Sequence, residues 1–317
     1  MLDVLAATFP FFALVLAGHV ATRRGMLPQP AIAGLNSFVL YFALPAMLFR
    51  FGATTPVMAA LGGGLTAVWL FCMLVLVAFS IAVTRSARIG WNDAAFGALV
   101  ATFPNTGYMG VPLLAALLGE AAAAPAIATI LLDLVFTSSL CVALSRLGSA
   151  GTHGAGVAAR DALVGVVKNP LPWSIVAGIA VHASAVPLPG PLARTIALLA
   201  DAASPAALFT IGAMLARSQM TSPTRTPAAD VVPLALVKLV VHPLLVLAIG
   251  LAAIDLGLPL GRASLTVVVL VAALPSASNV AVLAERFGAD SGRIARVILL
   301  STAAAFLSFS AAVAWLV

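Results

Sequence analysis

The sequence contains few charged residues and almost no cysteine. Of its 317 residues only 8% are charged, and 2 are cysteines. A soluble domain normally carries about 25% charged residues, so this chain cannot cover a surface that faces water. Cys72 and Cys141 both fall inside apolar runs, and their spacing predicts neither a disulfide framework nor a metal site. The composition therefore excludes an ordinary soluble protein and a cysteine-rich secreted one.

Apolar sequence is what the chain has in abundance. Hydrophobic residues make up 62% of it, and the mean hydropathy is +1.15. A helix of about 20 apolar residues crosses the hydrocarbon core of a bilayer. We therefore predict an all-α integral membrane protein surrounded by the lipid bilayer. The apolar runs predict ten transmembrane helices, at about 4–22, 35–52, 61–84, 93–118, 122–146, 170–186, 192–216, 231–254, 263–286 and 293–316.

The basic residues predict how these helices are oriented. A net charge of +6 would suit a nucleic-acid partner, but the basic residues are scattered at helix ends, so no such partner is expected. Most of them fall in loops on one side of the membrane, among them Arg23, Arg85, Arg146 and Arg217. The positive-inside rule makes these loops cytoplasmic. Both termini of this multi-pass protein are then expected outside the cytoplasm.

The two halves of the chain share a pattern of motifs. L-P-A-M-L-F-R-F-G (44–52) in the second predicted helix parallels S-P-A-A-L-F-T-I-G (204–212) in the seventh, and the fourth and ninth helices each carry a central proline. This predicts a first five-helix repeat over 1–147, a cytoplasmic linker over 148–168 and a second repeat over 169–317. Because five is an odd number, the second repeat runs inverted through the membrane. Inverted repeats with interrupted helices in matching positions are typical of secondary transporters.

The fourth and ninth helices should be broken at their prolines. Pro104 and Pro275 lack an N–H and crowd the carbonyl four residues earlier. Unwound backbone at membrane depth is tolerated only inside protein or beside a watery cavity. If the two breaks face each other, half-helix N-termini there offer free N–H groups and a partial positive charge, which suits a carboxylate. The predicted substrate-binding residues are Thr102, Pro104, Asn105, Thr106, Pro275, Ser276, Ser278 and Asn279.

Three motifs resemble the auxin efflux carrier family: P-N-T-G-Y-M-G-V-P-L-L (104–114), L-P-A-M-L-F (44–49) and L-P-S-A-S-N-V-A-V-L-A-E-R-F-G (274–288). That family includes plant auxin carriers and bacterial malonate or dicarboxylate permeases, and the similarity spans essentially the whole chain. The resemblance implies an elevator-type transporter of a bacterial inner membrane. Helices 1, 2, 6 and 7 would form a scaffold that makes a homodimer, and helices 3–5 and 8–10 would form the moving domain. The long cytoplasmic loop of many plant relatives is missing, which weakens the expectation of auxin itself as substrate.

Four ionisable side chains inside the predicted spans are candidates for coupling or charge compensation. Lys238 and His242 lie four residues apart and share a helix face. Lys238 either extends toward the cytoplasmic surface or neutralises a substrate carboxylate or a buried acid. Asp133 and Asp201 are candidate proton carriers, because burial favours the neutral form of a carboxyl group. Asp133 belongs to the expected moving domain and is the better coupling candidate, whereas Asp201 could face the substrate pathway or bond the broken helix.

These features together predict a secondary transporter of small organic anions, such as malonate or an auxin-like acid, and not an enzyme. No cofactor or metal site is expected, and a proton is the favoured coupling ion. Hydroxyl and amide oxygens at the breaks would also suit sodium, but neither break contains an acidic residue. An anion channel is a further alternative, although the chain has no repeated charged ring or filter sequence. The prolines could also simply bend helices that Asn and Ser side chains hold together.

Overall fold

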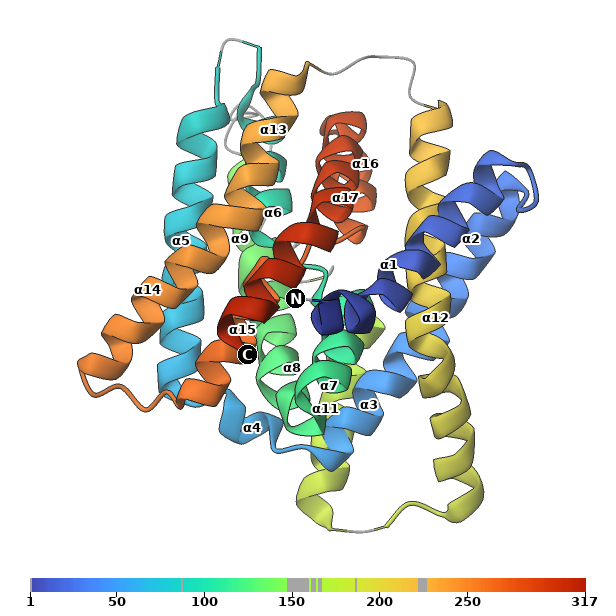
Figure 1. The fold of residues 1–317 in the computed structure, drawn as a ribbon, viewed down its shortest axis with the longest axis vertical. Helices are drawn as coiled ribbons and strands as arrows, with labels where there is room; N and C mark the ends of the chain where they lie inside the picture. Colours follow the sequence, from blue (N-terminus) through green and yellow to red (C-terminus); the bar gives the residue numbers. More distant parts are fainter. Residues whose placement is uncertain are drawn as a thin grey trace. The chain divides into compact units, whose positions relative to one another are not determined.

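Helices account for nearly all of the structure, a computed structural model that describes residues 2–86, 88–146, 160, 164, 167–185, 187–221 and 227–317 (Figure 1). Within these ranges no residue lies in a β-strand. Apart from residues 160, 164, 167 and 168, the predicted linker 148–168 lies outside the described residues.

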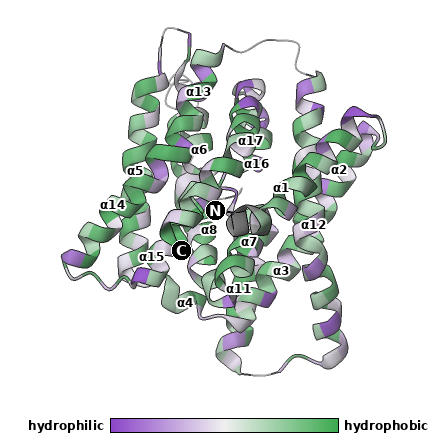
Figure 2. Ribbon diagram, in the orientation of Figure 1, coloured by the Kyte–Doolittle hydropathy of each residue, from purple (hydrophilic) through white to green (hydrophobic). Residues whose placement is uncertain are grey.

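Several of these helices are long enough to cross a bilayer. Figure 2 shows that hydrophobic residues cover most of their length, with hydrophilic residues mainly toward the ends. The prediction of an all-α, multi-pass membrane protein is therefore confirmed. The described residues contain 6 helical segments that are long and apolar enough to span a membrane: Gln29–Thr54, Gly63–Thr84, Glu120–Ser145, Gly190–Met220, Ala228–Asp255 and Ser291–Leu316. The segments Thr106–Leu118 and Arg262–Ala273 are apolar but shorter.

The chain divides into two compact units, and the first combines Met1–Leu61, Thr106–Ala128 and Asn169–Thr221. In this unit α1 (Leu2–Arg23) packs along α12 (Gly190–Thr221). The remaining elements are α2 (Gln29–Phe38), η1 (Val39–Ala43), α3 (Leu44–Thr54), α4 (Val57–Ala60), η2 (Thr106–Gly110), α7 (Val111–Leu118), η3 (Glu120–Ala122), the first part of α8 (Ala123–Leu132) and α11 (Pro170–Ser184). Of these, α3 packs against both α11 and α12.

The second unit combines Gly62–Asn105, Thr129–Lys168 and Ser222–Val317. Here α5 (Gly63–Thr84) packs against α6 (Trp91–Thr102) and α14 (His242–Asp255). The remaining elements are the end of α8, η4 (Asp133–Thr137), α9 (Ser138–Ser145), α13 (Ala228–Leu236), η6 (Val237–Val241), α15 (Arg262–Ala273), α16 (Asn279–Arg286) and α17 (Ser291–Leu316). Of these, α9 packs on α6, and α15 packs on both α14 and α17.

Short π-helical turns interrupt several of the helices. Three of these turns, η1, η2 and η6, end two residues before a proline: Pro45, Pro112 and Pro243. A proline cannot donate to the carbonyl four residues earlier and crowds it, and a wider turn relieves that crowding. Such turns are frequent at functional sites. Here η2, η4 and η6 contain the predicted site residues Thr106, Asp133 and Lys238.

Glycines allow the closest helix approach in the first unit. A Cβ atom added to Gly18 of α1 would collide with the carbonyl oxygen of Phe209 on α12, and one added to Gly212 of α12 would collide with the carbonyl oxygen of Val15 on α1. The two backbones therefore touch directly, without side chains between them. Small residues serve this purpose in membrane helix packing generally.

We expect Gly212→Ala to destabilise the protein because the added methyl group forces α1 and α12 apart. Overpacking of this kind costs about 1–3 kcal/mol, which thermal unfolding in detergent would detect. Gly34→Ala is the matched control, since a Cβ at Gly34 has no atom within 4 Å. Equal unfolding temperatures for the two variants would contradict the direct contact.

Candidate functional site

Both predicted helix breaks are present in the structure. The helix α6 ends at Thr102, and helical structure resumes with η2 at Thr106. The helix α15 ends at Ala273, and α16 begins at Asn279. Each central proline lies in one of these gaps, where its missing N–H would otherwise interrupt the hydrogen bonding of a continuous helix.

The two unwound stretches pair with each other. The Asn105 N–H donates to the Pro275 carbonyl at 2.8 Å, and the Ala277 N–H donates to the Phe103 carbonyl at 3.0 Å. Between these bonds the stretches form an isolated antiparallel β-bridge. The pairing satisfies backbone groups that the breaks would leave without partners, as a water-free environment requires.

Small polar side chains are buried at the breaks. Asn105 and Thr106 are each 2% exposed, and Ser276 is fully buried. Within the described part of the chain, Thr106 Oγ1 and Ser276 Oγ have no hydrogen-bond partner. Thr102 is also buried, but its hydroxyl donates to the Ala98 carbonyl at 2.8 Å and so stays within α6.

The beginning of α16 has no side-chain cap. Its cap residue, Ser278, is buried and makes no side-chain capping hydrogen bond. Asn279, the first helical residue, is half-buried. The first N–H groups of any helix lack intrahelical partners and carry a partial positive charge. The predicted residues Pro104, Asn105 and those of the second break thus lie together in the second unit, whereas Thr106 is grouped with the first.

Asp133 occupies a buried site of its own. It is 2% exposed, and its Oδ1 accepts two hydrogen bonds, from Trp69 Nε1 at 3.0 Å and from Thr137 Oγ1 at 2.7 Å. Its other oxygen, Oδ2, has no hydrogen-bond partner among the described residues. Sequence reasoning missed both donors. Thr137 could have been found from its spacing of four residues, but Trp69 comes from another helix and gave no signal.

Lys238 is fully buried, so its extension to the cytoplasmic surface is excluded. Its Nζ donates to the Ala272 carbonyl at 2.5 Å and lies 3.3 Å from His242 Nδ1. In an unbroken helix the Ala272 carbonyl would accept from the Ser276 N–H, which instead donates to Ser301 Oγ at 3.2 Å. Lys238 therefore caps the end of α15 at the break, where a cation also complements the helix dipole.

Trp69 and His242 connect the two ionisable groups. Trp69 donates to Asp133, and His242 lies beside Lys238. The centroids of the Trp69 and His242 rings are 5.5 Å apart, so these two residues link Asp133 to Lys238. Asp133 and Lys238 attract each other electrostatically across it. Three of the four predicted coupling residues thus form one buried cluster in the second unit.

Asp201 lies outside this cluster and belongs to the first unit. Its side chain is 68% exposed and forms an ion pair with Arg50 of α3 at 2.6 Å. The partner that the structure gives Asp201 is Arg50, which lies in α3 and not at either helix break. An exposed ion pair of this kind contributes only about 0–1 kcal/mol to stability.

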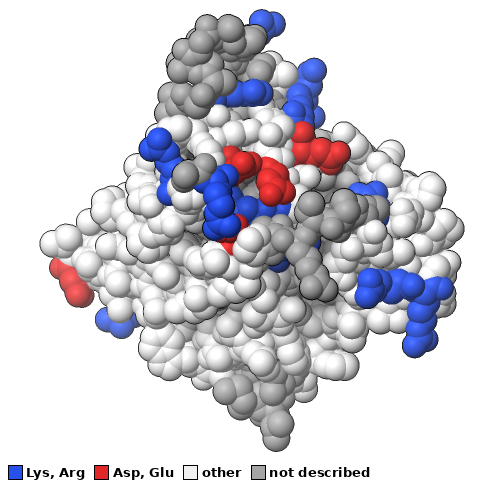
Figure 3. Space-filling view, turned by 90° about the horizontal axis from the view of Figure 1, so that it is seen from above, with Lys and Arg blue, Asp and Glu red and all other residues white. Residues whose placement is uncertain are grey.

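Charged residues also gather where α6, α13 and α17 begin. Arg293 donates from Nε to the Asp230 carbonyl and from Nη1 to the Asp93 carbonyl, both at 3.1 Å. The Asp93 carboxylate accepts from the Asp290 N–H at 2.8 Å. Figure 3, viewed from above, shows acidic side chains with basic ones beside them near the middle of the visible face. These contacts join the beginnings of three helices, and within the described residues only the Arg293 Nη2 atom of this group is buried without a hydrogen-bond partner.

Interrupted helices that pair at their breaks, in a multi-pass helical chain, are typical of membrane transport proteins. The chain matches the family model described as "Membrane transport protein" over residues 3–150 and 158–313. It therefore belongs to this family, which is the family of auxin efflux carriers that the sequence motifs indicated.

Proteins with assigned names show the same relationship. The chain is 29% identical over 304 residues to a "Putative malonate transporter" of Rhizobium meliloti, covering 95% of this chain and 92% of that protein. It is 27% identical over 281 residues to the "Uncharacterized transporter YfdV" of Escherichia coli, covering 88% of this chain and 86% of that one. Similarity to "Auxin efflux carrier component 2" of Arabidopsis thaliana is 32% over 123 residues, covering 38% of this chain and 19% of the plant protein.

We expect Lys238→Met to be strongly destabilising. The substitution leaves the buried Ala272 carbonyl without its donor and removes the electrostatic attraction to Asp133, and an unsatisfied buried polar group costs about 1–3 kcal/mol. Adding Asp133→Asn should recover part of this loss, because the double variant buries no unbalanced charge. Thermal unfolding of the two single variants and the double variant would measure the coupling.

Arg88→Met is the control for that comparison. Arg88 pairs with Asp230 through a side chain that is 69% exposed, so little change is expected. Purely additive losses in the double variant would contradict an energetic connection between Asp133 and Lys238.

Proposed function

We propose that this protein is a secondary active transporter of small organic anions, with its substrate site at the paired helix breaks. The observation that carries the proposal is the pairing of the two proline-containing stretches, beside which the buried Ser276 hydroxyl has no hydrogen-bond partner among the described residues and α16 begins without a side-chain cap. Free N–H groups, hydroxyls and the positive end of a helix bind carboxylates well. The names of the relatives, which mention malonate and auxin, agree with a carboxylate substrate.

Two inverted five-helix repeats are part of this proposal, and close helix contacts support it. Gly52 and Gly212 occupy equivalent places in the repeated motifs at 44–52 and 204–212. A Cβ on Gly52 would press on the Ile175 carbonyl of α11, as one on Gly212 would press on α1. The second predicted helix thus contacts the sixth, and the seventh contacts the first. An inverted repeat requires this exchange of partners.

We infer that transport proceeds by elevator-type movement. The helices expected to form the scaffold, α1, α2 with α3, α11 and α12, all belong to the first compact unit, and this unit would form the homodimer. The second unit holds the paired breaks and the Asp133–Lys238 cluster, and it would carry the substrate. Residues 106–128 belong to helices 4 and 5, which were expected to move, but they group with the first unit by their contacts, so the two units match the expected division only in part.

Proton coupling through Asp133 is the proposed source of energy. A carboxyl group that is buried beside Lys238 and has one oxygen without a partner can exchange a proton when the surroundings of the cluster change. Lys238 donates to the Ala272 carbonyl at the end of α15, so the cluster is connected to the break by a hydrogen bond. Sodium coupling remains the alternative, since hydroxyl and carbonyl oxygens are available at both breaks. We infer a location in a bacterial inner membrane, with both termini on the side away from the cytoplasm, from the distribution of basic residues in the loops.

Uptake into proteoliposomes tests the proposal directly. Labelled malonate and indole-3-acetate would be offered with and without an imposed pH gradient, and with a sodium gradient in a separate arm. Saturable uptake with counterflow, accelerated by the pH gradient, is the expected result. Acceleration by the sodium gradient alone would identify sodium, and not the proton, as the coupling ion. Flux that is insensitive to substrate on the opposite side would indicate a channel. The absence of uptake of any acid by folded protein would overturn the anion assignment.

Asn105→Ala should weaken substrate binding by about tenfold or more while the protein stays folded. The substitution removes a buried amide beside the break but leaves the backbone bond from the Asn105 N–H to Pro275 in place. Loss of a hydrogen bond to a charged group corresponds to about 1.5–3 kcal/mol. The concentration giving half-maximal uptake would report the change.

Thr84→Val serves as the control for Asn105→Ala, because the Thr84 hydroxyl is buried on α5 and bonds only the Ser80 carbonyl. Unaltered affinity in Asn105→Ala, or an equal loss in Thr84→Val, would contradict the assignment of the substrate site to the helix breaks.

Asp133→Asn should abolish the acceleration of uptake by a pH gradient, because the amide cannot take up and release a proton. Counterflow of labelled substrate, which needs no net proton movement, should persist in this variant. Measuring both in the same proteoliposomes separates coupling from transport. A preserved response to the gradient would exclude Asp133 as the proton carrier.

A further inference from the structure

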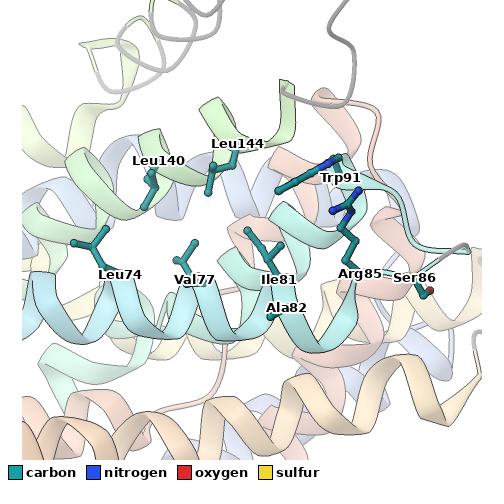
Figure 4. Close-up of a pocket in the computed structure, with 10 residues that line it drawn as sticks. Leu74, Val77, Ile81, Ala82, Arg85, Ser86, Trp91, Leu140 and Leu144 are labelled. Atoms are coloured by element: carbon teal, nitrogen blue, oxygen red, sulfur yellow. The ribbon is translucent and has the colours of Figure 1, made fainter.

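A groove runs between α5 and α9 in the second unit. Its volume is about 810 Å³, and its apolar lining includes Leu74, Val77 and Ile81 from α5 and Leu140 and Leu144 from α9 (Figure 4). Leu74 is 53% exposed, so the groove is open along its side rather than enclosed. None of its lining residues belongs to the helix breaks or to the Asp133–Lys238 cluster.

The length and position of the groove match one leaflet of a bilayer. Its lining on this side extends from Leu74, at the middle of α5, to Arg85, just beyond the end of α5. Eleven residues of α-helix extend about 16 Å. Half the hydrocarbon thickness of a bilayer is about 15 Å. The groove therefore has about the length of one leaflet.

A cationic group stands at the surface end of this groove. The Arg85 guanidinium lies over the Trp91 ring, 4.5 Å from its centroid, and both residues line the groove together with Ser86. Stacking uses the face of a guanidinium and leaves the N–H donors in its plane, in a geometry that suits a phosphate. Trp is itself favoured at the membrane surface.

Among the described residues, Arg85 forms no ion pair with an acidic side chain. The ion pairs of the described residues are Arg50–Asp201 and Arg88–Asp230, and neither includes Arg85. Its side chain is exposed at the end of an apolar channel. An anion at this position would therefore meet an uncompensated positive charge.

We propose that the groove is a binding site for an anionic phospholipid. One acyl chain lies along the leucine-lined groove between α5 and α9, and the phosphate group binds the Arg85 guanidinium and the Ser86 hydroxyl. Basic pockets between membrane helices bind anionic headgroups in this manner. A phospholipid combines the two chemistries that the groove offers at the required separation, whereas a water-soluble anion would leave the apolar part empty.

Native mass spectrometry of the full chain in detergent tests the headgroup site. Phosphatidylglycerol and phosphatidylcholine with the same acyl chains would be titrated separately, and bound lipid would be counted. Wild-type protein should bind phosphatidylglycerol preferentially. Arg85→Gln should weaken that binding by at least about tenfold, the effect of one charge-assisted contact, and leave phosphatidylcholine unaffected. Arg88→Gln is the matched control, because Arg88 lies in the same loop, pairs with Asp230 and does not line the groove.

A second pair of variants tests the acyl-chain site without changing any charge. Ala82→Phe places a ring in the groove and should reduce phosphatidylglycerol binding, whereas Val83→Phe, on the next residue outside the lining, should not. Equal binding of both lipids by wild type, or equal losses in Arg85→Gln and Arg88→Gln, would overturn the proposal. So would equal losses in the two Phe variants, or full displacement of the lipid by millimolar inorganic phosphate. The measurement is independent of transport and would stand if no substrate were carried.

Discussion

The backbone polar groups at a helix break need partners at a depth where a bilayer supplies no water, and the second unit is organised around that need. The stretches around Pro104 and Pro275 exchange backbone hydrogen bonds, as two edge strands would. Groups that this exchange does not reach take partners from other helices: Ser301 accepts from the Ser276 N–H, and Lys238 donates to the Ala272 carbonyl. The breaks are therefore held by side chains from α17 and η6 as well as by each other.

This arrangement explains why a lysine is buried at position 238. A cation in the membrane interior is expensive unless an opposite charge and hydrogen bonds compensate for it. Lys238 has a helix C-terminus to cap, and it has Asp133, whose carboxylate Trp69 and Thr137 hold in place. One side chain thus interacts with both the break and the acid. Coupling of a proton to the substrate site follows from this shared residue if the proposed function holds.

The sequence was informative wherever a residue acts on its own backbone. Pro104 and Pro275 break their helices through a missing N–H and a steric clash, so both interruptions could be predicted without knowing the fold. The surroundings of Lys238 could not be predicted, because extension to the surface and burial differ only in the direction that a helix face points. The partner of Asp201 could not be predicted either, because Arg50 is 151 residues away and no periodicity indicates that distance. The π-helical turns before prolines were readable in principle, from the crowding that each proline imposes on the preceding turn.

Unsatisfied buried groups provide the remaining argument about the site. Folded proteins leave few buried polar atoms without a hydrogen bond, so each one calls for an explanation. Among the described residues 8 buried side-chain atoms have no partner, and those of Thr106, Asp133 and Ser276 belong to residues singled out by the sequence for binding or coupling. The polar groups beside them are used: Thr102 bonds α6, and the Asn105 N–H bonds Pro275. Most polar groups at the breaks are thus hydrogen-bonded within the protein. The few that are not, on Thr106, Ser276 and Asp133, are the groups that would be available to a ligand or a proton.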